Sequence, residues 1–169
     1  MSERFAVLSA SEVDSIMLQS LQPYFTKELQ WVGGTVWGYS DQPEAWIQLG
    51  SQRGVDGTVL VAGQYLPAAP PLPDAEWEDI VEFSARAGTD YPGIVTDGLL
   101  DQDSPRAPRR LTSGPDDYRL RVHVSGRDNP GGTGQRVLVQ SWKQAPSAPE
   151  TLRLTSEFGK LTDFDHQWD

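Results

Sequence analysis

Residues 118–125, YRLRVHVS, alternate strictly between apolar and polar side chains. Successive side chains of a β-strand point to opposite faces, so this period of two residues predicts a strand with one apolar and one polar face. The apolar face consists of Tyr118, Leu120, Val122 and Val124, and the polar face of Arg119, Arg121, His123 and Ser125. We therefore expect a half-buried strand with a basic solvent face, in a chain whose formal net charge is -10.

Further β-prone runs follow at intervals of about ten residues, separated by turn-forming residues. They cover residues 4–9, 35–39, 45–49, 58–65, 76–86, 109–113, 135–142 and 151–158. Residues 11–21 could instead form a short helix, and the proline-rich residues 66–76 are expected to cross the sheet edges as an extended connector. The pattern predicts an all-β fold: a single domain over 1–169, built as an antiparallel β-sandwich with Greek-key-like or jelly-roll-like connections and little helix.

The composition limits the classes of partner. With 14 Lys and Arg against 24 Asp and Glu, direct binding of DNA or RNA is not expected, because such binders carry an excess of base. The chain has no cysteine, which excludes disulfides and zinc–thiolate sites. The first residues do not form a signal peptide, and no run approaches the roughly 18 apolar residues of a membrane-spanning helix. We therefore expect a cytoplasmic protein with no membrane partner.

Charge is segregated along the chain. Residues 74–103 carry nine acidic residues against one arginine, whereas residues 106–136 carry seven arginines against three aspartates. If the strands in these two segments are neighbours, their charged faces can pair across the sheet, and exposed pairs contribute about 0–1 kcal/mol each. We predict structural ion pairs formed by Glu78, Glu82, Arg119 and Arg121.

The uncompensated acids lie in a turn-rich loop. They are Asp90, Asp97, Asp101 and Asp103. Loops on a rigid scaffold commonly carry function, and an acidic loop complements the basic cleft in which a nuclease holds phosphate. We predict that these four aspartates bind a protein partner, although a net negative charge by itself also serves solubility.

Two histidines and an acidic C-terminal cluster could support other chemistry. Neither His123 nor His166 has the spacing of a metal site or an evident nucleophile partner, so we expect no catalysis and no cofactor, with His123 at the surface. Residues 160–169 are expected to be a mobile acidic tail. Its possible cation ligands are Asp163, Asp165, His166 and Asp169. The glycine-rich residues 126–134 lack the Lys-Ser/Thr of a P-loop and are expected to be a hairpin loop.

The six tryptophans leave a second kind of function open. They are Trp31, Trp37, Trp46, Trp77, Trp142 and Trp168. Sugar-binding β-sandwiches place aromatic side chains on an exposed face, although most tryptophans in a domain of this size belong to the core. Trp168 is the best candidate for an exposed one.

Two segments together resemble the competence protein J family. In residues 29–64 a tryptophan is followed by a glycine–aromatic step, a short strand, a polar turn and a strand of small apolar residues. In residues 111–126 a Gly-x-x-Tyr turn enters a strand. The resemblance spans about half of the chain and implies a compact β fold that inhibits a DNA-entry nuclease. The hairpin at 126–134 and the residues after Trp142 have no counterpart in it, and it supplies no site residues.

These observations predict a non-enzymatic intracellular β-sandwich that binds and inhibits a protein partner, a nuclease with a basic cleft. The alternatives are a carbohydrate- or small-ligand-binding module and a small hydrolase with an unrecognised site.

Overall fold

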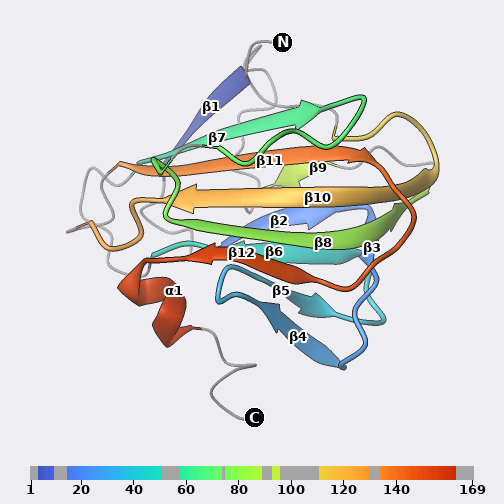
Figure 1. Ribbon diagram of the computed structural model, residues 1–169, viewed down its shortest axis with the longest axis horizontal. Coiled ribbons are helices and arrows are strands. Elements are labelled where there is room, and N and C mark those ends of the chain that lie inside the picture. Colours follow the sequence, from blue (N-terminus) through green and yellow to red (C-terminus); the bar gives the residue numbers. More distant parts are fainter. Residues whose placement is uncertain are drawn as a thin grey trace.

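Two layers of β-strands face each other in the computed structural model, which describes residues 4–9, 15–50, 58–73, 75–88, 93–95, 111–129 and 134–162 (Figure 1). We call the front layer sheet A and the rear layer sheet B. Sheet A has the order β1 (Arg4–Ser9), β7 (Thr58–Tyr65), β11 (Gln135–Lys143), β10 (Asp116–Ser125), β8 (Asp79–Ala87) and β12 (Glu150–Leu154), and β3 (Leu21–Pro23) also pairs with β8. Sheet B has the order β4 (Leu29–Val32), β5 (Val36–Tyr39), β6 (Glu44–Gln48), β2 (Ser15–Gln19) and β9 (Gly93–Val95).

The prediction of an all-β sandwich is confirmed. All neighbouring strands are antiparallel except β7 and β11, which run parallel. β7 and β8 are consecutive along the chain but have β11 and β10 between them. The connection from β7 to β8 therefore crosses two strands on the outer side of sheet A, and Figure 1 shows this segment passing in front of β11.

The core lies between the two sheets, because each sheet turns the apolar half of its alternating side chains inward. The face predicted from the 118–125 alternation takes part as expected. Core side chains include Ile16, Leu18, Val36 and Ile47 from sheet B and Val61, Phe83, Tyr118, Leu120, Val122 and Val139 from sheet A.

The sequence left residues 11–21 open to a short helix, and the part that the structure describes is not helical. Residues 15–19 form β2, in which Ile16 and Leu18 are buried while Met17 between them is partly exposed, so the period is two. Ser20 then adopts a positive φ of 60°, an uncommon conformation for a residue with a side chain. This turn lets the chain leave sheet B and enter sheet A at β3.

Two other boundaries also differ. Residues 111–113 of the predicted strand 109–113 form no strand, and residues 109 and 110 lie outside the described residues. The predicted mobile tail at 160–169 begins too early, because α1 spans Glu157–Leu161 and the Thr162 hydroxyl donates to the Gly34 carbonyl at 2.9 Å. Residues 163–169 lie outside the described residues.

The side chain of Arg127 joins both sheets at one end of the sandwich. Its Nη2 donates to Asp79 Oδ2 of sheet A at 2.6 Å and to Thr35 Oγ1 at 3.0 Å. Its Nη1 donates to the carbonyls of Gly34 at 2.8 Å and Gln48 at 3.2 Å. Gly34 lies in the turn before β5, and Gln48 is the last residue of β6. One guanidinium therefore holds the start of β8 against two segments of sheet B.

Asp79 extends this junction to the C-terminal helix. Its Oδ1 accepts from the backbone N–H groups of Thr155 and Ser156, and its Oδ2 accepts from the Ser156 hydroxyl at 2.6 Å. The Ser156 Oγ in turn accepts from Gly159 N and caps α1. A Cβ at position 159 would lie 2.7 Å from Arg127 Nη2, so only glycine fits beside the guanidinium.

We expect Asp79→Ala to lower the free energy of unfolding by about 3–5 kcal/mol, because it leaves the guanidinium of Arg127 buried without its counter-charge. The Arg127 and Asp79 side chains are 0% and 1% exposed. Lys143→Gln is the control, since Lys143 and Asp116 form a half-exposed pair at 3.6 Å, worth at most about 1 kcal/mol. Urea unfolding measures both variants, and equal losses would contradict the role given to the buried pair.

Candidate functional site

The basic face of β10 is buried, not exposed as predicted. Arg119 is 1% exposed and Arg121 is 6% exposed. β10 pairs with β8 in the register that sets Arg121 opposite Glu82, and this carboxylate accepts from both arginines. Arg119 Nε lies 3.1 Å from Glu82 Oε1, and Arg121 Nε lies 2.7 Å from Glu82 Oε2. Two of the predicted pairs are thus present, but they are buried and share one carboxylate.

The remaining guanidinium N–H groups of these arginines hold two proline-containing connectors against sheet A. Arg121 Nη1 donates to the carbonyls of Pro70 and Pro71, both at 3.1 Å. Arg119 donates to the carbonyls of Ser147 at 3.1 Å and Ala148 at 3.0 Å. The arginines of β10 are therefore structural, and no ligand is needed to explain them.

The prediction that Glu78 forms an ion pair with Arg119 or Arg121 is wrong. Its Oε1 accepts from the backbone N–H of Gly126 at 2.6 Å, and it does not reach Arg119 or Arg121. The register sets Arg121 opposite Glu82 but Val124 opposite Asp79, so Glu78 lies beyond the paired part of β8, far along the strand from both arginines. Its carboxylate instead anchors the turn that leads to Arg127.

The prediction that His123 lies at the surface is also wrong, because the residue is 1% exposed. Its Nδ1 lies 3.0 Å from the Leu138 carbonyl, and its ring packs against Trp77 with centroids 5.4 Å apart. Burial, with a smaller contribution from the Arg121 charge, lowers the pKa of His123 from 6.5 to about 4, against the opposing effect of the Leu138 hydrogen bond. The side chain is therefore neutral at pH 7 and belongs to the packing of the outer face of sheet A.

We expect the free energy of unfolding to fall as the pH drops from 6.5 towards 4, because the unfolded histidine gains a proton in this window while folded His123 stays neutral. His123→Asn should flatten the pH dependence in this window, since its amide can replace Nδ1–H as donor and does not titrate. Chemical denaturation at several pH values measures both proteins. Parallel pH profiles would contradict the assignment.

The predicted partner-binding loop lies outside the described residues. Asp90, Asp97, Asp101 and Asp103 all fall there, as do Asp163, Asp165, His166, Asp169 and Trp168. Among the residues that the structure describes, no three Asp, Glu, His or Cys side chains gather as metal ligands. In the same part of the chain, no helix is long and apolar enough to cross a membrane.

The structure instead brings three tryptophans together on the outer face of sheet B. The strand register sets Trp31 opposite Trp37 and Trp37 opposite Trp46, and Trp46 is in turn opposite Met17. All four side chains are partly exposed, because their neighbours along each strand point into the core. We call this line of side chains across four strands the tryptophan row.

The rings of the tryptophan row are stacked with an offset. Ring centroids are 5.8 Å apart for Trp31 and Trp37 and 5.5 Å apart for Trp37 and Trp46, with interplanar angles of 30° and 12°. Because planes in contact lie only about 3.5–4 Å apart, these separations require a sideways shift. Each ring therefore covers only part of its neighbour.

The sequence already contained a signal for this row. In WVGGTVW, residues 31–37, the two tryptophans are equally far from Gly34, the middle residue of a three-residue turn over 33–35. Gly33 and Gly34 have φ values of 53° and 58°, which glycine adopts readily, and a Cβ on Gly33 would come within 3 Å of Val81 and Thr151. A three-residue turn with equal arms pairs Val32 with Val36 and Trp31 with Trp37. The position of Trp46 depends on the register of β6.

Three carboxylates lie along one side of the tryptophan row, where the strands β4, β5 and β6 begin or end. Glu28 precedes β4, Asp41 lies in the turn between β5 and β6, and Glu44 begins β6. The Glu28 carbonyl accepts from Ser40 N at 3.2 Å, which brings the first of these residues to the same turn. Lys27 is the neighbouring cation. The exposed surface therefore combines an aromatic row with an acidic rim.

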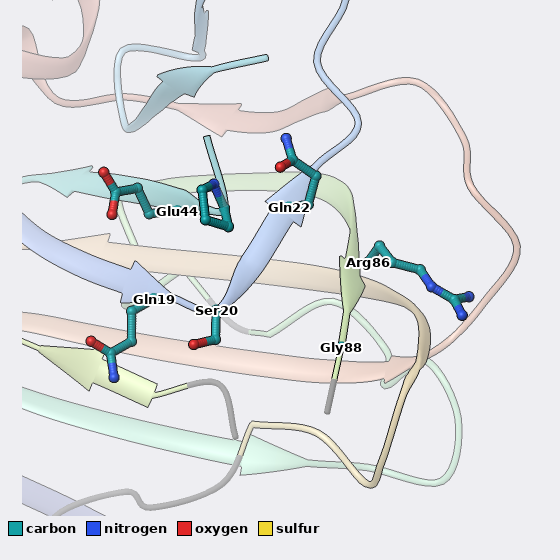
Figure 2. A pocket seen from close by; sticks show the side chains of 7 residues that line it. Gln19, Ser20, Gln22, Glu44, Arg86 and Gly88 are labelled. Atoms are coloured by element: carbon teal, nitrogen blue, oxygen red, sulfur yellow. The ribbon is translucent and has the colours of Figure 1, made fainter. Parts of the chain in front are cut away.

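A hollow of about 520 Å³ borders this rim (Figure 2). It is lined by Gln19, Ser20, Gln22, Pro43, Glu44, Arg86 and Gly88. Gln22 Nε2 donates to the Ser40 carbonyl at 2.8 Å and Arg86 pairs with Asp117 at 3.5 Å, so these two side chains are already engaged. Figure 2 shows Arg86 directed away from Glu44 and Gln19. The polar groups of this hollow do not converge on a common point, as a small-molecule site would require.

A second hollow of about 370 Å³ lies beside α1. Its charged lining is committed to the fold: Arg127 bonds Asp79, and the two carboxylate oxygens of Asp128 accept from the backbone N–H groups of Glu157 and Phe158. The tryptophan row is therefore the described surface best suited to bind a partner.

Comparisons with protein families, with curated proteins and with solved structures found no match for this chain. The resemblance to the competence protein J family stays a prediction.

We expect Trp37→Ala to lower the free energy of unfolding by about 1–2 kcal/mol more than Trp46→Ala. Trp37 contacts two stacked indoles and the edge of Tyr39, and its Nε1 lies 3.3 Å from Gln48 Oε1, whereas Trp46 stacks on Trp37 alone. Each aromatic pair contributes about 0.5–1.5 kcal/mol beyond its buried area. Urea unfolding of the two variants makes the comparison, and a larger loss for Trp46→Ala would contradict the described row.

Proposed function

We propose that this chain is a non-enzymatic protein-binding β-sandwich that docks a basic protein on the tryptophan row. The observation that carries the proposal is the set of three offset-stacked, partly exposed tryptophans in a line with Met17 on the outer face of sheet B. None of the described residues forms a further layer over this face.

The side chains of this surface are those that protein interfaces favour. Tryptophan, tyrosine and methionine are enriched at interface centres, and a few buried aromatic residues commonly supply most of the binding energy. Tyr39 contacts Trp37 with centroids 6.2 Å apart, and Leu29, two residues from Trp31 on the same strand face, is 43% exposed. The row therefore has an apolar centre with a polar rim.

The charge of the chain supports a basic partner. The formal net charge is -10, and the described rim of the row adds three carboxylates against the single amine of Lys27. Opposite charge speeds the encounter of two proteins and disfavours acidic competitors. A nuclease with a basic cleft has this chemistry, and inhibition of a nuclease is what the family resemblance implies.

The acidic loop remains part of this hypothesis as a prediction. Asp97, Asp101 and Asp103 add charge in a segment that the structure does not describe, so the tryptophan row supports the proposal without them. Either surface would favour the same class of partner, because both are acidic.

Carbohydrate binding is the second candidate, and one observation favours it. The offset leaves part of each indole face uncovered, and the apolar face of a sugar ring can stack on such a surface. For the third candidate, a small hydrolase, the described part of the chain supplies no candidate catalytic residue.

We expect affinity capture from the native cell to retain a basic protein on the wild type and to lose it with the double variant Trp31→Ser and Trp46→Ser. Loss of two interface anchors should weaken binding by at least about 2 kcal/mol. Retention on the wild type should also fall as salt is raised, because the charges of the rim are screened. Quantitative mass spectrometry measures the retained protein, and its DNA-cleavage activity with and without the wild type tests inhibition.

Leu72→Ser is the matched control, because Leu72 is 56% exposed on the connector outside sheet A and leaves the tryptophan row intact. Equal retention by the double variant and the wild type would contradict docking on the row. Retention of a neutral oligosaccharide in place of any basic protein would favour the second candidate.

A further inference from the structure

We propose that one end of the tryptophan row is a guanidinium-binding subsite, formed by Trp46, Glu44, Met17 and Gln19, that receives an arginine side chain of the partner. The inference rests on the proposed function and names the chemical group that the face would recognise first. It is carried by the strand register, by the exposure of these four side chains and by their lack of partners.

The register places the four side chains at the corners of a square. β2 and β6 are antiparallel, with Met17 opposite Trp46 and Gln19 opposite Glu44. Residues two apart on a strand share a face, so Trp46 and Glu44 point the same way, as do Met17 and Gln19. The intervening Ala45 and Leu18 are fully buried, which fixes these four on the outer side. Directly opposite Cβ atoms in such pairs are about 5 Å apart, which suits a planar group the size of guanidinium.

This combination of groups fits a guanidinium better than a compact ammonium. The indole of Trp46 offers a ring face for cation–π contact, and the Glu44 carboxylate can accept two parallel N–H bonds from one side of a guanidinium plane. The Gln19 amide oxygen can accept a further bond. An ammonium carries the same charge but cannot stack its plane on a ring or bond a carboxylate with a rigid fork.

The four side chains are not satisfied within the described chain. Trp46 stacks on the ring of Trp37, and its Nε1 donates to no described residue. Glu44 forms no ion pair with any described residue, whereas the Glu82 carboxylate in the interior bonds two arginines. The chain stacks its own arginines on aromatic rings elsewhere: Arg121 lies 5.3 Å from the Trp142 centroid and Arg136 lies 4.6 Å from that of Trp77. The subsite offers the same stacking of a guanidinium on a tryptophan ring to an arginine of another protein.

The hollow of about 520 Å³ gives the incoming side chain room beside the carboxylate. Glu44 and Gln19 line it, and Figure 2 shows both side chains directed away from Arg86. The nearest competing cation is thus turned from the subsite and paired with Asp117 at 3.5 Å. A partner arginine can approach Glu44 without meeting Arg86.

The test uses the full chain labelled with nitrogen-15 and acetylated hexa-arginine as the probe. We expect the probe to shift the indole N–H resonance of Trp46 more than those of the other tryptophans, and to bind at least about fivefold more tightly than acetylated hexa-lysine of equal charge. Glu44→Gln should weaken hexa-arginine binding about tenfold. Asp41→Asn, which removes one exposed charge in the neighbouring turn, should weaken it about twofold or less.

Equal affinity for the two peptides with no selective shift at Trp46 would overturn the subsite, and so would equal losses from Glu44→Gln and Asp41→Asn. Thermal unfolding of both variants should match the wild type, since both carboxylates are at the surface. Failure of the guanidinium subsite can be distinguished from failure of docking on the tryptophan row. If the captured protein is lost with the double tryptophan variant but retained by Glu44→Gln, the row is the docking face and the guanidinium subsite is wrong.

Discussion

The buried ion pair of Arg127 and Asp79 lies where four parts of the chain meet at one end of the sandwich. It joins the β10–β11 hairpin to the start of β8, to the β4–β5 turn and to the cap of α1. A guanidinium withdrawn from water is stable only when its donors find acceptors, and four of them do here. The β4–β5 turn that carries Trp31 and Trp37 is held in place by this pair, so the outer face of sheet B depends on it.

A second buried charge cluster holds the connectors that cover the outer face of sheet A. Glu82 neutralises Arg119 and Arg121, and their remaining donors bind carbonyls of two connectors that prolines keep from forming strands. These connectors have no sheet partners for their carbonyls, and the arginines supply donors instead. A strand face that looks like a surface for an acidic ligand is therefore the inner lining of a third, irregular layer over sheet A.

The two outer faces of the sandwich thus differ in what covers them. Sheet A is covered by connectors fixed by charge, whereas the tryptophan row of sheet B has no described layer above it. Stacking among Trp31, Trp37 and Trp46 stabilises an aromatic surface that remains partly open to water. An open aromatic row with carboxylates along one side, in an acidic chain, is suited to a basic protein, and a guanidinium group matches the chemistry of Trp46 and Glu44.

The sequence by itself determined the fold class and the apolar face of β10, because alternation and turn residues are local signals that one strand carries alone. It also predicted that Glu82 lies beside Arg119 and Arg121. Only the tertiary structure decided that this charged face is buried, that Glu78 bonds Gly126 and that His123 is neutral, since alternation shows which face is polar but not what covers it. It alone added Trp46 and Met17 to the row and set Glu44 opposite Gln19, because the register between β5 and β6 and between β2 and β6 depends on contacts across the sheet that no single segment encodes.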